Sequence, residues 1–255
     1  MPNSFFWYEL MTSDTAAAGA FYSAIIGWDT ESAGAPNDRY SLFTLGGKDR
    51  GVAGMMEMPE DYSKAGGKPC WTGYIKVDDV DAAAQRLKQA GGAIHKPPTD
   101  IPEVGRFAVV ADSQGTMFNI MKPKGEDQPS PPGGTPGFVG WHELYAVDGQ
   151  SAFDFYAGQF GWTKAEALNM GPMGIYQLFA AGGDAVGGIM TKPKEIPAPA
   201  WQFYFNVEAA DATAARIAEK DGRVLMGPHE VPGGSWIVQA VDPQGAMFAV
   251  VAPRR

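Results

Sequence analysis

Cysteine is almost missing from this chain, since Cys70 is the single one among 255 residues. No disulfide can form within the chain, which fits a reducing compartment, and we expect a cytoplasmic protein. Cys70 lies between Pro69 and Trp71 at the predicted start of a strand, and no histidine is close to it in sequence. Its thiol is therefore expected to be buried and inert rather than nucleophilic.

Basic residues are also in short supply. The chain has 20 lysines and arginines against 29 aspartates and glutamates, and its formal net charge is −9. Nucleic acids and anionic membranes attract positively charged surfaces, so we expect neither as a partner. No apolar run is long enough to span a bilayer. The first residues lack a basic region followed by an apolar stretch, so no signal peptide is expected.

Several motifs that carry chemistry are missing as well. The chain has no Gly-x-x-x-x-Gly-Lys-Ser/Thr loop for phosphate and no Gly-x-Ser-x-Gly turn for a nucleophilic serine. The acidic stretch 78–81 lacks the spacing of a calcium loop and is expected to start a helix. With 45% apolar and 19% charged residues, the composition is that of an ordinary globular protein.

What the chain does have is an internal repeat. Residues 112–120 (DSQGTMFNI) and 242–250 (DPQGAMFAV) share Asp, Gln, Gly, Met and Phe at identical spacing, 130 positions apart. A short turn with Asp and Gly that enters an apolar run is typical of a β-hairpin. The chain is therefore predicted to be a tandem duplication. Further motifs recur in the same order: Trp-x-Glu-Leu at 7–10 and 141–144, and Phe-Tyr followed by Gly-Trp at 21–28 and 155–162.

Each half is predicted to hold two β-α-β-β-β units. At the start of the first half, for example, a strand at 5–10 precedes a helix that ends near Gly27. Residues 123–137 are crowded with proline and glycine and lack apolar periodicity, which indicates a linker. The predicted organisation is a first domain over 1–122, the linker over 123–137, and a second domain over 138–255.

These motifs carry a family resemblance. The Asp-initiated helix with Phe-Tyr and Gly-Trp, the run Val77–Ala82 and the closing Asp-x-Gln-Gly-x-x-Phe hairpin resemble the vicinal-oxygen-chelate superfamily of glyoxalases, bleomycin-resistance proteins and extradiol dioxygenases. More narrowly, residues 105–109 (GRFAV) with 112–115 (DSQG) resemble two-domain hydroxylase or glyoxalase-like proteins of actinobacteria. The resemblance implies an α+β fold. Each domain would close two β-α-β-β-β units into an incomplete barrel around a cleft.

In the metal-using relatives, the ligands of a domain come from four strands. The residues at the matching positions are Trp7, Met56 (with Glu57 as the alternative), Thr72 and Asn119 in the first half, and Trp141, Met190, Gln202 and Ala249 in the second. A divalent catalytic centre needs His, Asp, Glu or Cys ligands, so we expect no family-type metal site and no cofactor. A site completed by Glu9 or Glu143 is the alternative left open. His142 is one position off and should face the other way.

The same strands favour a small-molecule pocket. Aromatic walls with a few polar groups are typical of pockets for flat or cationic ligands. The alternative is that these side chains only fill the interior of a small barrel. The expected lining residues are Trp7, Met56, Thr72, Tyr74, Asn119 and Met121 in the first half, and Trp141, Glu143, Met190, Gln202 and Tyr204 in the second.

Glu9 and Glu143 are the candidate catalytic residues. Each lies two positions after a tryptophan at a cleft-facing strand position, where an unpaired carboxylate is costly to bury. Each is suited to act as a general base with a raised pKa. The alternative for Glu9 is an ion pair with Arg106, a candidate ligand-binding residue. Trp236 stands at the matching position of the second half, so that pair would not repeat.

Three functions stay open at this point. The first is a metal-independent binding protein for a small aromatic or amphipathic molecule. The second is a glyoxalase- or hydroxylase-like enzyme that acts on a small oxygenated molecule, with Glu9 or Glu143 as base or with an unrecognised divalent metal. The third is a scaffold with closed clefts. Whether the chain forms a homo-oligomer is left open.

Overall fold

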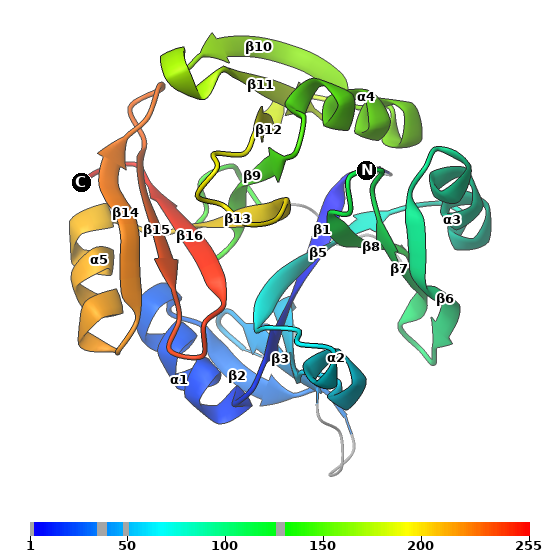
Figure 1. Ribbon diagram of the computed structural model, residues 1–255. Helices are drawn as coiled ribbons and strands as arrows, with labels where there is room; N and C mark the ends of the chain where they lie inside the picture. Colours follow the sequence, from blue (N-terminus) through cyan, green and yellow to red (C-terminus); the bar gives the residue numbers. More distant parts are fainter. Residues whose placement is uncertain (1–2, 35–39, 48–50, 126–130) are drawn as a thin grey trace. The chain divides into compact units, whose positions relative to one another are not determined.

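The computed structural model describes residues 3–34, 40–47, 51–125 and 131–255. Part of the predicted linker, residues 126–130, therefore lies outside the described residues. The first half contains β1 (Phe5–Thr12), α1 (Thr15–Ile26), β2 (Asp29–Ser32), β3 (Tyr40–Thr44), β4 (Gly51–Glu57), α2 (Glu60–Lys64), β5 (Cys70–Lys76), α3 (Val80–Gln89), β6 (Ala93–Ile101), β7 (Gly105–Ala111) and β8 (Met117–Pro123) (Figure 1).

The second half repeats this order. It contains β9 (Val139–Ala146), α4 (Gly149–Phe160), β10 (Thr163–Asn169), the 3-10 helix η1 (Gly171–Met173), β11 (Ile175–Ala180), β12 (Ala185–Thr191), β13 (Ala200–Asn206), α5 (Ala210–Glu219), β14 (Arg223–Glu230), β15 (Trp236–Val241) and β16 (Met247–Ala252). Helix α2 belongs to the first half and η1 to the second. None of the helices in the described ranges is long and apolar enough to cross a membrane.

Each half forms one mixed sheet of eight strands. The first sheet has the order β2-β3-β4-β1-β5-β8-β7-β6, and the second has the matching order β10-β11-β12-β9-β13-β16-β15-β14. Strands β1 and β4 pair in parallel, as do β5 and β8, whereas the hairpin partners are antiparallel. Over the described residues, the edge strands of a sheet do not pair with each other, so neither sheet closes. The predicted α+β fold with tandem incomplete barrels is confirmed.

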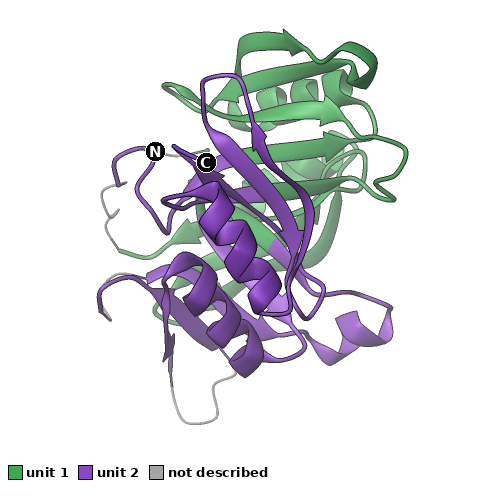
Figure 2. Ribbon diagram, turned by 90° about the vertical axis from the view of Figure 1, so that its left-hand side faces the viewer, with its two compact units in different colours: residues 1–6, 72–129, 142–202 green, residues 7–71, 130–141, 203–255 purple. Residues whose placement is uncertain are grey.

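The compact packing units do not follow the two halves of the sequence. Unit 1 consists of residues 1–6, 72–129 and 142–202, and unit 2 consists of residues 7–71, 130–141 and 203–255 (Figure 2). Each unit thus combines one β-α-β-β-β module of the first half with one module of the second half. The predicted domain boundaries at 122 and 138 remain a prediction about the chain's organisation.

Helix starts and ends follow the local sequence. Asp14, Asp79 and Asp148 are the N-caps of α1, α3 and α4, and each carboxylate accepts a hydrogen bond from a backbone N–H three residues later. Such caps stabilise a helix by about 1 kcal/mol. Gly27 and Gly161 end α1 and α4 with φ values of 89° and 71°. This left-handed conformation favours glycine, which explains the repeated Gly-Trp motif.

In unit 2, the repeated Asp-x-Gln-Gly turn holds a helix of the other half. The Asp242 carboxylate accepts a hydrogen bond from the Tyr22 hydroxyl of α1 at 3.1 Å, and it accepts three more from the backbone N–H groups of residues 244–246. The Trp71 indole N–H donates to the same Tyr22 oxygen at 2.8 Å. Burial raises the pKa of the Asp242 carboxyl, although its hydrogen bonds act in the opposite direction. The turn is therefore a docking point for α1.

Unit 1 contains the same network. The Tyr156 hydroxyl of α4 donates to Asp112 at 3.2 Å, and the Trp201 indole N–H donates to the Tyr156 oxygen at 3.0 Å. Asp112 also accepts from the backbone N–H groups of Gln114 and Thr116, both at 2.8 Å. The motif that marks the duplication in the sequence is thus a structural turn in both units.

Candidate functional site

The four longer helices α1, α3, α4 and α5 pack against the sheets. The sheet face opposite these four helices is here termed the helix-free face, although Tyr62 of the short helix α2 reaches Cys70 on the first sheet. Trp71 and Trp201 lie on the helix side, because their indoles reach tyrosines of α1 and α4. Side chains alternate along a strand, so Thr72 and Gln202 lie on the helix-free face.

In unit 2, a first carboxylate cluster is formed by Trp7, Glu9, Tyr40 and Gly54. Glu9 of β1 is paired in register with Gly54 of β4, and only 8% of its surface is exposed. The Tyr40 hydroxyl accepts a hydrogen bond from the Trp7 indole N–H at 3.2 Å. A Cβ atom on Gly54 would overlap the Tyr40 hydroxyl, so glycine is needed for the tyrosine to cross β4 at this point. The cluster places a carboxylate next to two aromatic side chains.

In unit 1, a second carboxylate cluster is formed by Glu143, Tyr176 and Gly188. Glu143 of β9 is paired with Gly188 of β12, and it is also 8% exposed. A Cβ atom on Gly188 would overlap the Tyr176 ring. Met190, a predicted lining residue, is buried and paired in register with Tyr176. The Glu-Gly-Tyr arrangement is therefore present once in each unit.

Both glutamates have interaction partners in the structure. The charge of Glu9 also acts on Cys70 in unit 2. Burial raises the pKa of the Cys70 thiol, and Glu9 raises it further, whereas the hydrogen bond with the Tyr62 hydroxyl lowers it. Cys70 is half-buried rather than buried as expected, and a thiol with a raised pKa is a poor nucleophile, which agrees with the expected inertness.

Two polar residues on the first sheet's helix-free face, Asn119 and Thr72, form a hydrogen bond with each other. In unit 1, the Asn119 side-chain amide donates a hydrogen bond to the Thr72 hydroxyl at 3.0 Å. Asn119 is 3% exposed and is paired in register with Tyr74. Met121 is buried and paired with Phe107, whose ring centroid lies 6.3 Å from that of Tyr74. This part of the face is a packed patch closed by its own hydrogen bond.

The matching positions of the second half behave differently. Gln202 of unit 1 is 4% exposed, and its Nε2 atom has no hydrogen-bond partner within the described ranges. Tyr204 of unit 2 is buried, and its hydroxyl accepts a hydrogen bond from the Gln239 amide at 2.6 Å. Gln239 was not expected from the sequence. Its register opposite Ala249 depends on strand pairing that local patterns do not reveal.

The remaining predicted residues are spread over both units. Trp141 is half-buried and belongs to unit 2, as does the half-buried Met56. Arg106 of unit 1 forms ion pairs with Asp81 at 2.7 Å and with Asp100 at 3.0 Å, and both carboxylates are well exposed. The Arg106 guanidinium holds the pKa of the Asp81 carboxyl below its usual range. Arg106 is therefore a surface ion-pair residue of unit 1.

His142 points to the helix side, as strand alternation predicts. Its Nδ1 atom lies 2.7 Å from the Val186 carbonyl oxygen, and because that oxygen only accepts, Nδ1 carries the proton. The ring stacks on Phe5 with a centroid distance of 4.9 Å. Burial lowers the pKa of His142 to about 4. The ring is a neutral packing residue.

The residues at the family's metal positions do not fit a divalent ion. Among the described residues, no group of three or more His, Cys, Asp or Glu side chains is arranged to hold a metal. Indole, thioether, hydroxyl and amide groups stand at the matching positions, whereas a catalytic zinc or iron site uses imidazole, carboxylate or thiolate ligands. The absence of a metal site stays a prediction, and it rests on this donor set.

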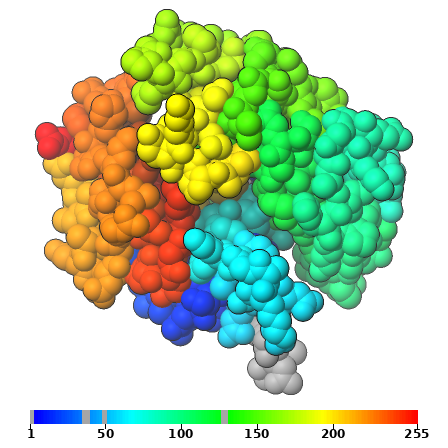
Figure 3. Space-filling view, viewed as in Figure 1, coloured from blue at the N-terminus to red at the C-terminus, as the bar shows by residue number. Residues whose placement is uncertain are grey.

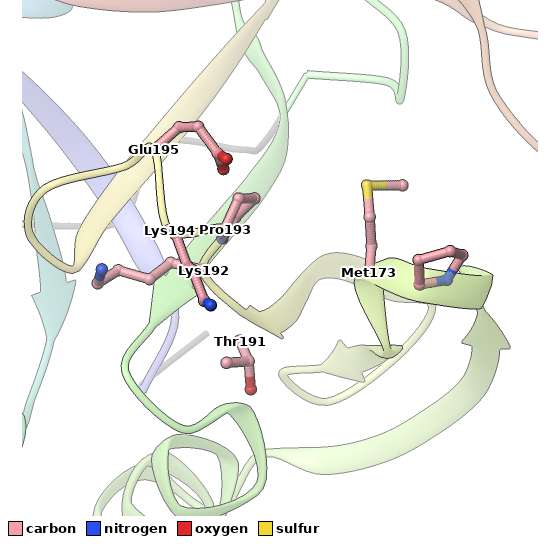
Figure 4. Close-up of a pocket in the computed structure, with 7 residues that line it drawn as sticks. Met173, Thr191, Lys192, Pro193, Lys194 and Glu195 are labelled. Carbon is pink, nitrogen blue, oxygen red and sulfur yellow. The ribbon is translucent and has the colours of Figure 1, made fainter.

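Two surface hollows lie elsewhere in unit 1 and were not expected from the sequence. One has a volume of about 360 Å³ and is lined by Pro172, Met173 and residues 191–195. Figure 4 shows Met173 across from the segment Thr191–Glu195, and Figure 3 shows the yellow atoms of this region on the surface. The other, of about 380 Å³, lies beside Arg106. Neither is lined by Glu9, Glu143 or Gln202.

Comparison with known proteins decides the family. The sequence model of the Glyoxalase/Bleomycin resistance protein/Dioxygenase superfamily matches residues 4–120 and 139–250. This chain belongs to that superfamily. The two matched segments correspond to the two eight-stranded sheets, so the resemblance inferred from the sequence motifs is confirmed.

The relatives of this superfamily member include proteins that match it over nearly their whole length. "Putative glyoxylase CFP32" of Mycobacterium tuberculosis is 32% identical over 249 residues, which cover 97% of this chain and 94% of the relative. "Anthracycline biosynthesis protein DnrV" of Streptomyces peucetius is 31% identical over 261 residues, covering 97% and 92%. The chain is therefore a two-domain, glyoxalase-like protein.

Solved structures show the same fold at low sequence identity. The Mn(II)-bound glyoxalase from Novosphingobium aromaticivorans has a TM-score of 0.68 at 16% identity, and the match covers 99% of this chain and 82% of that one. Homoprotocatechuate 2,3-dioxygenase from Brevibacterium fuscum has a TM-score of 0.69 at 12% identity, covering 98% and 82%. At such identities the likeness establishes the fold, and function depends on the site residues.

Proposed function

We propose that this chain binds a small, planar, oxygen-bearing aromatic molecule at its carboxylate clusters, without the divalent metal of its relatives. The observation that carries the proposal is a buried carboxylate next to at least one aromatic side chain in each unit, Trp7 and Tyr40 in unit 2 and Tyr176 in unit 1. Glu9 lies in register with the glycine that Tyr40 crosses, and Glu143 lies in register with the glycine that Tyr176 crosses. Both carboxylates have interaction partners within the chain, and their position beside aromatic rings suits a planar ligand that bears hydroxyl groups.

The chemistry of the clusters matches this ligand class. Indole and phenol rings offer flat surfaces on which a planar ligand can stack. A carboxylate accepts strong, short hydrogen bonds from hydroxyl groups and so favours an oxygen-bearing ring over a hydrocarbon. One relative bears the name of an anthracycline biosynthesis protein. Since an anthracycline is a flat polycyclic molecule with several oxygen substituents, this name agrees with the proposed class.

A second candidate function is a glyoxalase- or hydroxylase-like enzyme that acts on a small oxygenated molecule. The burial of Glu9 and Glu143 favours it, because a carboxylate shielded from water is well suited to take up a proton from a bound substrate. The two functions differ in what the carboxylate contributes. For an enzyme, Glu143→Gln removes turnover and leaves ligand affinity largely unchanged. For a binding protein, it weakens affinity.

The test is titration of chelator-treated protein with a dihydroxyanthraquinone, followed by tryptophan fluorescence and calorimetry. Wild-type protein is expected to bind it with a micromolar Kd. Glu9→Gln and Glu143→Gln are each expected to weaken binding about tenfold, which corresponds to loss of one charge-assisted hydrogen bond. Glu60→Gln is the matched control, since the Glu60 side chain is 81% exposed. Lack of binding by the wild type would contradict the proposal.

A further inference from the structure

Gln202 carries an unmet hydrogen-bonding requirement. It is 4% exposed, and within the described part of the chain its Nε2 atom has no acceptor. A buried donor without a partner costs about 1 to 3 kcal/mol, so native proteins rarely keep one. The position therefore calls for an acceptor atom from outside the chain.

In the first half, the position that matches Gln202 is hydrogen-bonded within the chain. At the matching place, Thr72 accepts a hydrogen bond from Asn119 at 3.0 Å, and that pair is complete. In the second half, Gln202 replaces the threonine, and Ala249 stands at the position that matches Asn119. Alanine has no polar side chain, so the second half has a longer donor at the first position and no polar side chain at the second.

The side of the sheet that carries Gln202 also carries Glu143. Within unit 1, His142 stacks on Phe5, and Phe5 packs against Trp201 with a centroid distance of 5.0 Å, so His142 and Trp201 share the helix side. Strand alternation then puts Glu143 and Gln202 on the helix-free face. Their strands, β9 and β13, are neighbours in the sheet. An amide donor and a carboxylate acceptor are thus presented by adjacent strands.

We propose that Gln202 is a specificity-determining residue that donates a hydrogen bond from Nε2 to a carbonyl oxygen of the ligand, of the kind found in a quinone. The inference deepens the proposed function and rests on it. Glu143 accepts from a ligand hydroxyl on the same face. A hydroxyquinone, which has both an acceptor and a donor, satisfies both residues, and the second half is the selective half of the chain.

The test uses two probes that differ only in their carbonyl oxygens, anthraquinone sulfonate and anthracene sulfonate. The variant is Gln202→Met, which keeps the side-chain length and removes the amide. The matched control is Gln85→Met, because Gln85 is an exposed residue of α3 in the same unit. Affinities are measured by calorimetry and the unliganded stability by thermal unfolding.

We expect Gln202→Met to weaken anthraquinone sulfonate binding about tenfold and to change anthracene sulfonate binding less than twofold. The melting temperature without ligand is expected to stay equal or rise, since an unpaired polar group has been removed. Gln85→Met is expected to change none of these values.

Three results would overturn the inference while the proposed function stands. One is unchanged quinone affinity, another is an equal loss for both probes, and the third is a lowered melting temperature at unchanged affinity, which would mean that ordered water satisfies the amide. If the wild type binds neither probe, the proposed function fails together with the inference.

Discussion

Units 1 and 2 have the same architecture, but their Asp-x-Gln-Gly turns differ in how many hydrogen bonds they form with the helix that each turn holds, α4 in unit 1 and α1 in unit 2. In unit 1, the Gln114 amide forms two hydrogen bonds with the backbone of Asp148, the N-cap of α4, both at 2.8 Å. In unit 2, the matching Gln244 has a buried Oε1 atom with no partner in the described ranges. The shared Asp-x-Gln-Gly motif therefore docks a helix through its aspartate in both units, and its glutamine adds hydrogen bonds to the helix N-cap in unit 1.

Within unit 1, the two halves of the sequence also differ at matching positions of strands β5 and β13. The first half closes its polar patch with the Thr72–Asn119 bond, whereas the second half leaves Gln202 with a free donor atom among the described residues. Duplicated halves can keep one fold while only one of them retains an open polar group. Substitutions at the matching motifs test how the two units differ in stability.

The first prediction concerns what the units share. Asp112→Ala and Asp242→Ala should each lower the free energy of unfolding by about 3 to 4 kcal/mol, because each removes the carboxylate that accepts hydrogen bonds from a tyrosine hydroxyl and from several backbone N–H groups. Urea unfolding measures the effect. Asp112→Asn and Asp242→Asn, which keep one acceptor oxygen, should lose much less. A loss below 1 kcal/mol in either alanine variant would contradict the docking role of the turn.

The second prediction concerns the pH dependence of stability, to which His142 contributes in unit 1 and the matching Tyr8 does not in unit 2. Burial lowers the pKa of His142 to about 4, so the folded state binds fewer protons than the unfolded chain between pH 6.5 and 4. Stability should be complete above pH 6.5 and fall by about 3 kcal/mol as pH drops through 4. In unit 2, Tyr8 takes the matching place, and burial raises its pKa, so no titration is expected there in this range.

Urea unfolding between pH 7 and 4.5 measures this dependence. His142→Asn is the control, because its amide can donate to the Val186 carbonyl but has no acid titration. The variant should show a flatter pH profile than the wild type. An identical slope in both proteins would show that other groups cause the acid sensitivity.

The third prediction compares the two carboxylate clusters. Gly54→Ala should displace Tyr40 and break its bond with Trp7, and Gly188→Ala should displace Tyr176. Each should cost about 2 kcal/mol of stability through overpacking. Adding Gly54→Ala to Tyr40→Ala should cost little, since the clash is already gone, and thermal unfolding of the four proteins gives the coupling. Additive losses would contradict the contact.

The fourth and smallest effect tests the glutamine difference directly. Gln114→Ala should lower the free energy of unfolding by about 1 kcal/mol, because it leaves the Asp148 backbone without two partners. Gln244→Ala should change stability by less than about 0.5 kcal/mol or increase it slightly. Urea unfolding of both variants measures these changes. Equal losses in the free energy of unfolding would show that the two glutamines contribute equally to stability.

The sequence alone determined the duplication, the four β-α-β-β-β modules and the superfamily, because these depend on local features. Asp14 and Asp148 begin helices, Gly27 and Gly161 end them, and apolar periodicity marks strands. These local features do not predict the full length of strand β6, because the strand contains Pro97 and Pro98. An edge strand tolerates prolines where a central strand does not.

Only the tertiary structure decided which modules pack together and what the repeated motifs do. Tyr22 and Asp242 are 220 residues apart, and no local pattern reveals that they form a hydrogen bond. Strand register also decides that Glu9 pairs with Gly54 and that Tyr40 crosses this glycine. It likewise decides that the Gln202 Nε2 atom lacks an acceptor among the described residues. Register is fixed by packing across the whole sheet, so the sequence could name these residues as candidates but could not assign their partners.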